Sequence, residues 1–207
     1  MWGSILAVFL LFIFMIGTAS ADVYKSFSEL KNHEKVGVDY QILQHLTDSQ
    51  TIVLAIHGGS IEKETDRIAY AVAKKGVYDF YGFIGLNSSP LHVTSTRFND
   101  PTALRMVAKS NKTLSIHGYR NTSESLTLVG GQDKALAAKV KSELKAAGFN
   151  ISTAKGELGG YSDYNICNKN STGKGVQLEL STKLRRQLAD DENKFQKYVN
   201  ALVNALQ

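Results

Sequence analysis

The sequence predicts an α/β fold: a three-layer sandwich built around a mixed, largely parallel central sheet. Stretches with apolar residues at helical spacing alternate with short apolar runs, which is the pattern of strands connected by helices. Turn-forming residues bound the short runs. Two of these runs also end in the same dipeptide, His57-Gly58 and His117-Gly118. In open α/β sheets, ligands bind beyond the carboxyl ends of the strands.

Hydrophobic spacing and turn residues divide residues 51–206 into strands and helices. Short apolar runs bounded by Gly, Asn, Asp or Pro predict strands, and apolar residues at helical spacing predict helices. The Ala- and Lys-rich stretch before Gly148 is a predicted helix that the glycine ends. In chain order we expect a strand at 51–57, a helix at 61–75, strands at 79–86, 92–98, 114–119 and 126–129, a helix at 132–147, strands at 149–153 and 176–180, and a long helix at 182–206.

The N-terminal residues predict a signal peptide at 1–21. Residues 2–16 are almost wholly apolar, and Ala19-Ser20-Ala21 has the small-residue pattern of a cleavage site before Asp22. An uncleaved anchor helix is the alternative, but the apolar stretch is short for a membrane span of about 20 residues. We therefore expect a secreted, extracellular protein with no stable membrane insertion after cleavage.

Residues 22–207 have the size of a compact unit and contain no Pro-rich or Ser-rich linker, so we expect a single domain in a monomeric protein. The one cysteine, Cys167, rules out an internal disulfide, and we interpret it as a small buried apolar residue. The net charge of +5 favours an anionic partner. The basic residues are scattered and match no nucleic-acid-binding motif, so we expect no nucleic-acid partner.

Two histidines and a glutamate at strand ends predict a metal site. If the strands that carry His57 and His117 lie side by side in parallel, both imidazoles emerge at the same edge of the sheet. Gly58-Gly59 lets the chain turn tightly, so that Glu62 can come back towards them. Two His and one carboxylate leave the fourth position of a catalytic zinc site open. Zn2+ is the expected cofactor, with cobalt or manganese as alternatives.

A second carboxylate lies among apolar residues in the last predicted strand. Because side chains alternate along a strand, Glu179 shares a face with Gln177 and Ser181, and the apolar residues share the other. A carboxylate in a partly buried strand needs a partner or a task. Glu179 is therefore a candidate general base, which takes a proton from water and returns it to the leaving amine. Half of an ion pair is the alternative role.

Four ordered motifs together resemble the phage-type poly-γ-glutamate hydrolases, a family similar in fold to the zinc carboxypeptidases. They lie at 57–62, 91–98, 115–118 and 175–181. The resemblance extends from about residue 36 to residue 188. It implies a zinc-dependent hydrolase that cleaves the γ-glutamyl amide bonds of an anionic polymer, poly-γ-glutamate. It further implies that His57, Glu62 and His117 bind the zinc and that Glu179 is the catalytic base.

The resemblance also implies a set of substrate-binding residues. Arg97 and Arg120 are the best candidates for holding a substrate carboxylate, because a guanidinium offers a bidentate fork. At Asn168-Lys169-Asn170 the sequence departs from the Asn-Arg-Gly turn expected of the family, so Lys169 keeps the charge but loses the fork. Substrate preference is therefore open. The candidate substrate-binding residues are His92, Thr94, Ser95, Arg97, Arg120 and Lys169.

Each candidate also has a purely structural interpretation. A single His at a strand end is commonly a hydrogen-bonded structural residue, and Glu62 could be a favourable anion in the first turn of a helix. Arg97 or Arg120 could form an ordinary salt bridge. Two alternative functions are left open: a zinc carboxypeptidase or amidase acting on another acyl-amino acid or a cell-wall peptide, and a non-catalytic secreted module that binds an anionic polymer.

Overall fold

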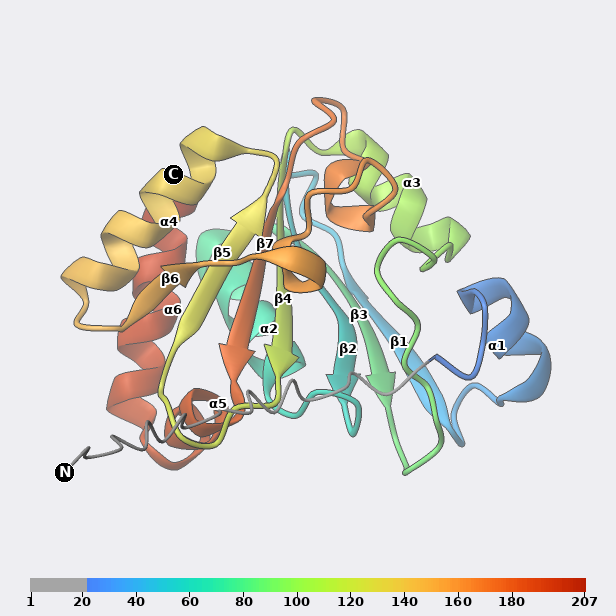
Figure 1. Cartoon of the computed structure of the whole chain (residues 1–207). Helices are drawn as coiled ribbons and strands as arrows, with labels where there is room; N and C mark the ends of the chain where they lie inside the picture. Colours follow the sequence, from blue (N-terminus) through green and yellow to red (C-terminus); the bar gives the residue numbers. More distant parts are fainter. Residues whose placement is uncertain (1–21) are drawn as a thin grey trace, which may run out of the picture.

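The computed structural model describes residues 22–207 as alternating strands and helices (Figure 1). The predicted signal peptide, residues 1–21, lies outside the described residues. In chain order the elements are α1 (Phe27–His33), β1 (Tyr40–His45), β2 (Thr51–Gly59), α2 (Thr65–Gly76), β3 (Asp79–Gly85), α3 (Pro101–Lys109), β4 (Lys112–Tyr119), β5 (Thr127–Gly131), α4 (Lys134–Ala146), β6 (Ile151–Thr153), the 3-10 turns η1 (Gly156–Gly159) and η2 (Ile166–Asn168), β7 (Val176–Ser181), α5 (Thr182–Asp190) and α6 (Glu192–Leu206).

The strands form one seven-stranded sheet in the order β1-β3-β2-β4-β7-β5-β6. The four central strands, β3, β2, β4 and β7, run parallel to one another. At the edges, β1 is antiparallel to β3, and β5 is antiparallel to β7 while β6 is parallel to β5. The predicted α/β fold with a mixed, largely parallel sheet is therefore confirmed.

Two apolar cores lie on opposite faces of the sheet and produce three layers. On one face Val53 and Ala55 of β2 pack with α2, α4 and α6. On the other face Ile52, Leu54 and Ile56 of the same strand pack with α1 and α3. This division follows from the alternation of side chains along a strand. In Figure 1, α2 is seen behind the central strands, α4 and α6 lie at the left of the sheet, and α1 and α3 lie at its right.

Residues 92–98 do not form the predicted strand. Their backbone groups bond elsewhere: the Thr94 N–H donates to the Asp22 carboxylate at 2.8 Å, and the Arg97 N–H closes a turn onto the Thr94 carbonyl. The Ser95 carbonyl accepts the first backbone N–H of η2. Because these groups have partners outside the sheet, the segment is a loop between β3 and α3.

Besides the 3-10 turns η1 and η2, the structure contains three elements that the sequence analysis did not predict: α1, β1 and α3. The signal for α3 was present, because Asp100 caps the helix by accepting the Thr102 N–H and Pro101 occupies its first turn. The predicted helix at 61–75 begins only at Thr65. The predicted helix at 182–206 is divided at Asp191, whose extended backbone ends α5 and whose side chain caps α6. Within residues 22–207 there is no helix of the length and apolarity that crossing a membrane requires.

Candidate metal centre

His57, Glu62 and His117 converge near the carboxyl ends of β2 and β4, which are neighbouring parallel strands. The two Nδ1 atoms of the histidines lie 3.1 Å apart. Glu62 Oε1 lies 3.0 Å from His57 Nδ1, and Glu62 Oε2 lies 3.7 Å from His117 Nδ1. One potential ligand atom from each side chain falls within 4.8 Å of the other two. The three residues can therefore contact a single cation.

A tight turn after β2 brings Glu62 back to the two histidines. Gly59 has a φ of +65°, and a Cβ at this position would collide with the Gly85 carbonyl oxygen. The Glu62 N–H donates to the His57 carbonyl at 2.9 Å, and its carboxylate accepts the Gly118 N–H at 2.8 Å. Because α2 begins three residues later, Glu62 is not an anion in the first turn of a helix.

The outer nitrogens of both histidines are held by neighbouring groups. His57 Nε2 lies 2.9 Å from the Val93 carbonyl oxygen, and His117 Nε2 lies 2.8 Å from Ser115 Oγ. A carbonyl oxygen only accepts, so His57 Nε2 carries a hydrogen and its Nδ1 faces the other two side chains. Metal-binding histidines are commonly oriented in this way, by a bond from the nitrogen that does not touch the metal.

Burial and mutual charges set the protonation of the three side chains. Burial raises the pKa of Glu62, but the two histidines outweigh it and the net shift is downwards. Burial and the charge of His57 lower the pKa of His117 to about 3. Burial lowers the pKa of His57, but Glu62 outweighs it and raises the net value. These protonation states suit a divalent metal, because Glu62 is ionised and His117 is neutral. A cation can displace the remaining proton on His57. The donor set fits zinc.

Glu179 lies next to this cluster. Strand β7 pairs with β4 in a register that places Glu179 opposite His117, and its side chain is buried. Gln177 Nε2 donates to Glu179 Oε1 at 2.9 Å. Burial, together with the charge of Glu62, raises the pKa of Glu179 well above its usual range. The charge of Arg185 opposes this shift in part, but no salt bridge within 4.0 Å joins Glu179 to a cation among residues 22–207.

Part of the predicted substrate-binding set borders the metal residues. The His92 ring lies against the His57 ring, with 4.2 Å between the ring centroids. Thr94 and Ser95 follow in the same loop, where Ser95 is buried and its carbonyl contacts η2. The Arg97 side chain is half exposed, and its guanidinium lies 3.7 Å from the Asp22 carboxylate. Of this loop, His92 and Val93 contact His57 directly.

The other two predicted substrate-binding residues lie outside this loop. Arg120 is exposed, one residue beyond the end of β4. Lys169 Nζ lies 5.1 Å from the centre of the Tyr164 ring. The next residue, Asn170, donates to Thr113 near the beginning of β4, whereas the metal ligand of that strand lies near its end. The structure therefore does not bring Lys169 to the metal residues, and its role stays a prediction.

The motifs did not reveal some residues that support the site. Asp22 bonds to the loop that contains His92. Asn165 donates to Gln177 at 2.8 Å, behind Glu179. Arg185 packs against Gly118 and donates to the Lys63 carbonyl at 2.7 Å. Only Gln177 carried a signal in the sequence, because strand alternation places it on the same face as Glu179.

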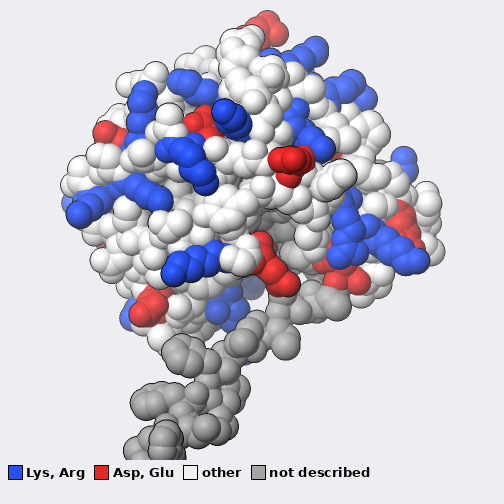
Figure 2. Space-filling view, turned by 45° about the horizontal axis from the view of Figure 1, so that its top comes forward, with Lys and Arg blue, Asp and Glu red and all other residues white. Residues whose placement is uncertain are grey.

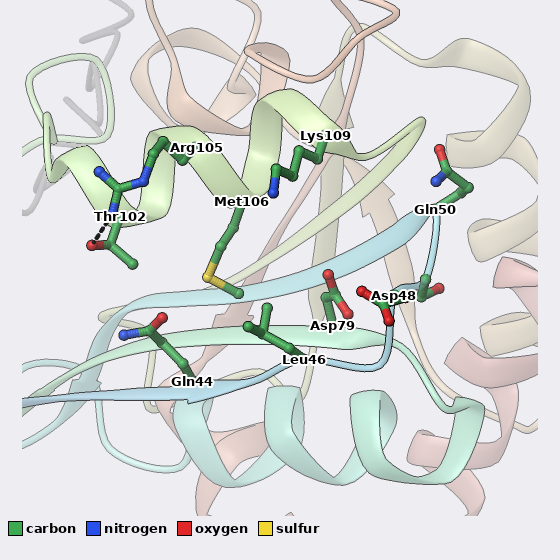
Figure 3. A pocket seen from close by; sticks show the side chains of 10 residues that line it. Gln44, Leu46, Asp48, Gln50, Asp79, Thr102, Arg105, Met106 and Lys109 are labelled. Carbon is green, nitrogen blue, oxygen red and sulfur yellow. Dashed lines mark hydrogen bonds between the residues drawn. The ribbon is translucent and has the colours of Figure 1, made fainter.

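A separate pocket of about 390 Å³ lies between the β1–β2 connection and α3 (Figure 3). Asp48 and Asp79 lie on one side of it, and Arg105 and Lys109 of α3 lie on the other. The pocket also includes Gln50, which precedes β2. Because the predicted metal ligands lie at the other end of the parallel strands, this pocket is not part of their site.

Comparison with known proteins identifies the family. The model of the poly-gamma-glutamate hydrolase family matches residues 24–202. The chain belongs to the poly-gamma-glutamate hydrolase family. It is 44% identical over 174 residues to the SPbeta prophage-derived UPF0714 protein YoqZ of Bacillus subtilis strain 168, covering 82% of this chain and 62% of YoqZ. It is 40% identical over 189 residues to the UPF0714 protein YndL of the same strain, covering 86% of this chain and 73% of YndL. The match thus spans less than two thirds of the length of YoqZ.

Two solved structures agree with this assignment. The bacteriophage poly-gamma-glutamate hydrolase superposes with a TM-score of 0.86 at 33% identity, covering 89% of this chain and 96% of that one. A zinc-free structure of YndL superposes with a TM-score of 0.79 at 35% identity, covering 90% and 98% of the two chains. The family and the fold that the four motifs implied are therefore confirmed.

Proposed function

We propose that this member of the poly-gamma-glutamate hydrolase family is a secreted zinc-dependent hydrolase that cleaves the γ-glutamyl amide bonds of poly-γ-glutamate. The observation that carries the proposal is the convergence of His57, Glu62 and His117 beside Glu179. The substrate follows from the family, and zinc is supported by the donor set and by the zinc-free form in which YndL was solved. Secretion rests on the pattern of residues 1–21.

Each side chain of the site has a separate task in this proposal. His57, Glu62 and His117 would hold the zinc, which when bound lowers the pKa of water and polarises a carbonyl. Burial and the negative charge of Glu62 raise the pKa of Glu179, and bound zinc would offset that charge. The ionised Glu179 carboxylate would then take the proton from the attacking water and transfer it to the leaving amine. Gln177 keeps the Glu179 carboxylate in place through the bond to Oε1.

The proposed substrate is a polyanion, so cationic side chains near the cluster matter for binding. Arg97 is half exposed in the loop beside His57, and it can hold a glutamate carboxylate through its guanidinium. Arg120 extends the positive charge beyond the end of β4. On the face that Figure 2 shows, Lys and Arg side chains are spread over the surface with Asp and Glu between them. The net charge of +5 then attracts the polymer in general, and single arginines position it.

The test is incubation of the purified protein with poly-γ-glutamate of defined length, with added zinc or with a chelator. We expect the polymer to shorten with zinc and to keep its length with the chelator, as measured by size-exclusion chromatography. Unchanged polymer in the presence of zinc would contradict the proposal. Binding without cleavage would then favour the polymer-binding module, and cleavage of cell-wall peptides instead would favour the amidase alternative.

A further inference from the structure

The two oxygens of the Asp22 carboxylate bind the first and third residues of the tripeptide His92-Val93-Thr94, which lies in the loop between β3 and α3. Its side chain is only 3% exposed. Asp22 Oδ1 lies 2.6 Å from His92 Nδ1, and Oδ2 accepts the Thr94 N–H at 2.8 Å. The two oxygens therefore hold the residues on either side of Val93, and a third contact at 3.7 Å joins Oδ2 to Arg97.

The same tripeptide forms the support behind His57. The Val93 carbonyl accepts the hydrogen on His57 Nε2 at 2.9 Å, and the His92 ring lies against the His57 ring. Because residues 92–98 have no strand pairing, no backbone ladder fixes the direction of the Val93 carbonyl. The Val93 side chain is buried in the core, and the contacts of Asp22 to His92 and Thr94 restrain the backbone on either side of it. Hydrogen bonds from Thr94 and His92 outweigh burial and lower the pKa of Asp22, so the carboxylate is charged at neutral pH.

We propose that Asp22 is a positioning residue of the metal centre: it holds His92 and Val93 so that His57 Nδ1 stays directed at Glu62 and His117. The inference rests on the proposed zinc-dependent function. Asp22 contacts none of the three ligands and acts through His92 and Val93. The expected change is therefore in zinc affinity, and a change in turnover follows from it. Groups that orient a metal-binding histidine commonly change metal affinity by about 10- to 100-fold when they are removed.

The position of Asp22 links the metal centre to processing of the chain. Asp22 directly follows Ala21, where the sequence predicts signal cleavage. Cleavage at that bond would make Asp22 the first residue of the mature protein and would leave both of its side-chain bonds in place. Cleavage one residue later would remove Asp22 and both of these bonds. A mature chain that starts at Val23 should therefore bind zinc as weakly as Asp22→Ala does.

The experiment measures the zinc affinity of the purified protein by competition with a chromophoric chelator. We expect Asp22→Ala to weaken zinc binding by about 10-fold or more. Asp22→Asn keeps an oxygen for one of the two bonds and should recover part of the affinity. Tyr24→Phe is the matched control, because it keeps the aromatic ring and removes only the 2.5 Å hydrogen bond that joins the same N-terminal segment to Glu34. It should bind zinc like the unchanged protein.

Thermal unfolding monitored by circular dichroism confirms that each variant is folded before its affinity is compared. If Asp22→Ala does not fold, the zinc affinity of Asp22→Asn is the test. An affinity of Asp22→Asn equal to that of the unchanged protein overturns the inference. Equal zinc affinity of folded Asp22→Ala and the unchanged protein also overturns it, and so does an equal loss in Tyr24→Phe. Failure of the unchanged protein to bind zinc would instead refute the proposed function, so the two failures are distinguishable.

Discussion

At the residue scale, Glu179 is a buried carboxylate held by a chain of amides. Gln177 Nε2 donates to Glu179 Oε1, and Asn165 Nδ2 donates to Gln177 Oε1. Asn165 is fixed in turn, because its Oδ1 accepts the Cys167 N–H at 3.0 Å. Such a chain limits the rotation of the Glu179 side chain, which keeps it beside the metal ligands.

We predict that Glu179→Gln binds zinc like the unchanged protein and loses at least about 100-fold in kcat, because an amide cannot take the proton. Polymer cleavage and chelator competition measure the two properties. Glu157→Gln is the matched control, since Glu157 is exposed on η1 and should keep full activity. Normal turnover in Glu179→Gln would remove this residue from the role of base.

We predict that Gln177→Met lowers kcat by about 10-fold and leaves zinc affinity unchanged. Methionine has a similar shape but no amide, so Glu179 loses the bond that orients it. Steady-state kinetics should place the loss in kcat, with KM little affected. The exposed Gln196, which bonds to Glu192 on α6, offers the control substitution Gln196→Met. A loss in KM alone would argue that Gln177 shapes the binding surface instead.

At the element scale, the connection from β2 to α2 determines where the third ligand lies. The pairing of β2 with β3 shifts register between Ala55 and Gly58, and such irregularities re-aim side chains at the end of a strand. Gly59 then turns the chain with a positive φ close to the Gly85 carbonyl. The geometry of Glu62 therefore depends on a backbone conformation that other residues rarely adopt.

We predict that Gly59→Ala weakens zinc binding and lowers the free energy of unfolding by about 2 kcal/mol or more. The alanine would be strained at a positive φ, and its Cβ would also collide with the Gly85 carbonyl oxygen. Gly37→Ala is the control, since Gly37 has a φ of +81° with no atom within 4 Å of a Cβ. It should cost about 1–2 kcal/mol and leave zinc affinity unchanged. Chelator competition and urea unfolding measure both quantities. Equal zinc affinity in Gly59→Ala would show that the turn does not position Glu62.

The division between α5 and α6 leads to a prediction about stability alone. Asp191 accepts the Lys194 N–H at 2.9 Å and so caps α6. Asp191→Ala should lower the free energy of unfolding by about 1 kcal/mol, with activity unchanged. Asp190→Ala removes the same charge without a cap and should have little effect. Similar values for the two variants in urea unfolding would contradict the capping role.

At the scale of the whole molecule, the site is assembled from segments that are distant along the chain. His57 and His117 belong to different strands, and Glu179 lies on a third. A cation that binds only when these strands are in place stabilises the folded state over the unfolded chain. Zinc should therefore affect the unfolding of the entire protein, although it contacts only three side chains.

We predict that zinc at about 100 times its Kd adds about 2.7 kcal/mol to the free energy of unfolding. For a chain of this size that corresponds to a rise in Tm of roughly 5–10 °C. Calorimetry with zinc and with a chelator measures the shift. His117→Ala should lose the shift, because it removes one of the three ligands. An equal shift in His117→Ala would mean that zinc stabilises the protein from another site.

The sequence by itself determined the features that depend on local patterns. Strand periodicity predicted β2, β4 and β7, and the two glycines after His57 predicted the turn that returns Glu62. The parallel arrangement of the strands that carry His57 and His117 was also predictable, because alternating strands and helices favour parallel neighbours. These inferences need only the stereochemistry of residues that are close along the chain.

The tertiary structure alone decided which distant groups support that site. It made a loop of residues 92–98, because their backbone bonds go to Asp22 and to η2 and not to a neighbouring strand. It placed Lys169 away from the metal residues and brought Asp22 to His92, 70 positions along the chain. No local pattern encodes such contacts, since they form only when the packing of the whole sheet and its loops brings the partners together.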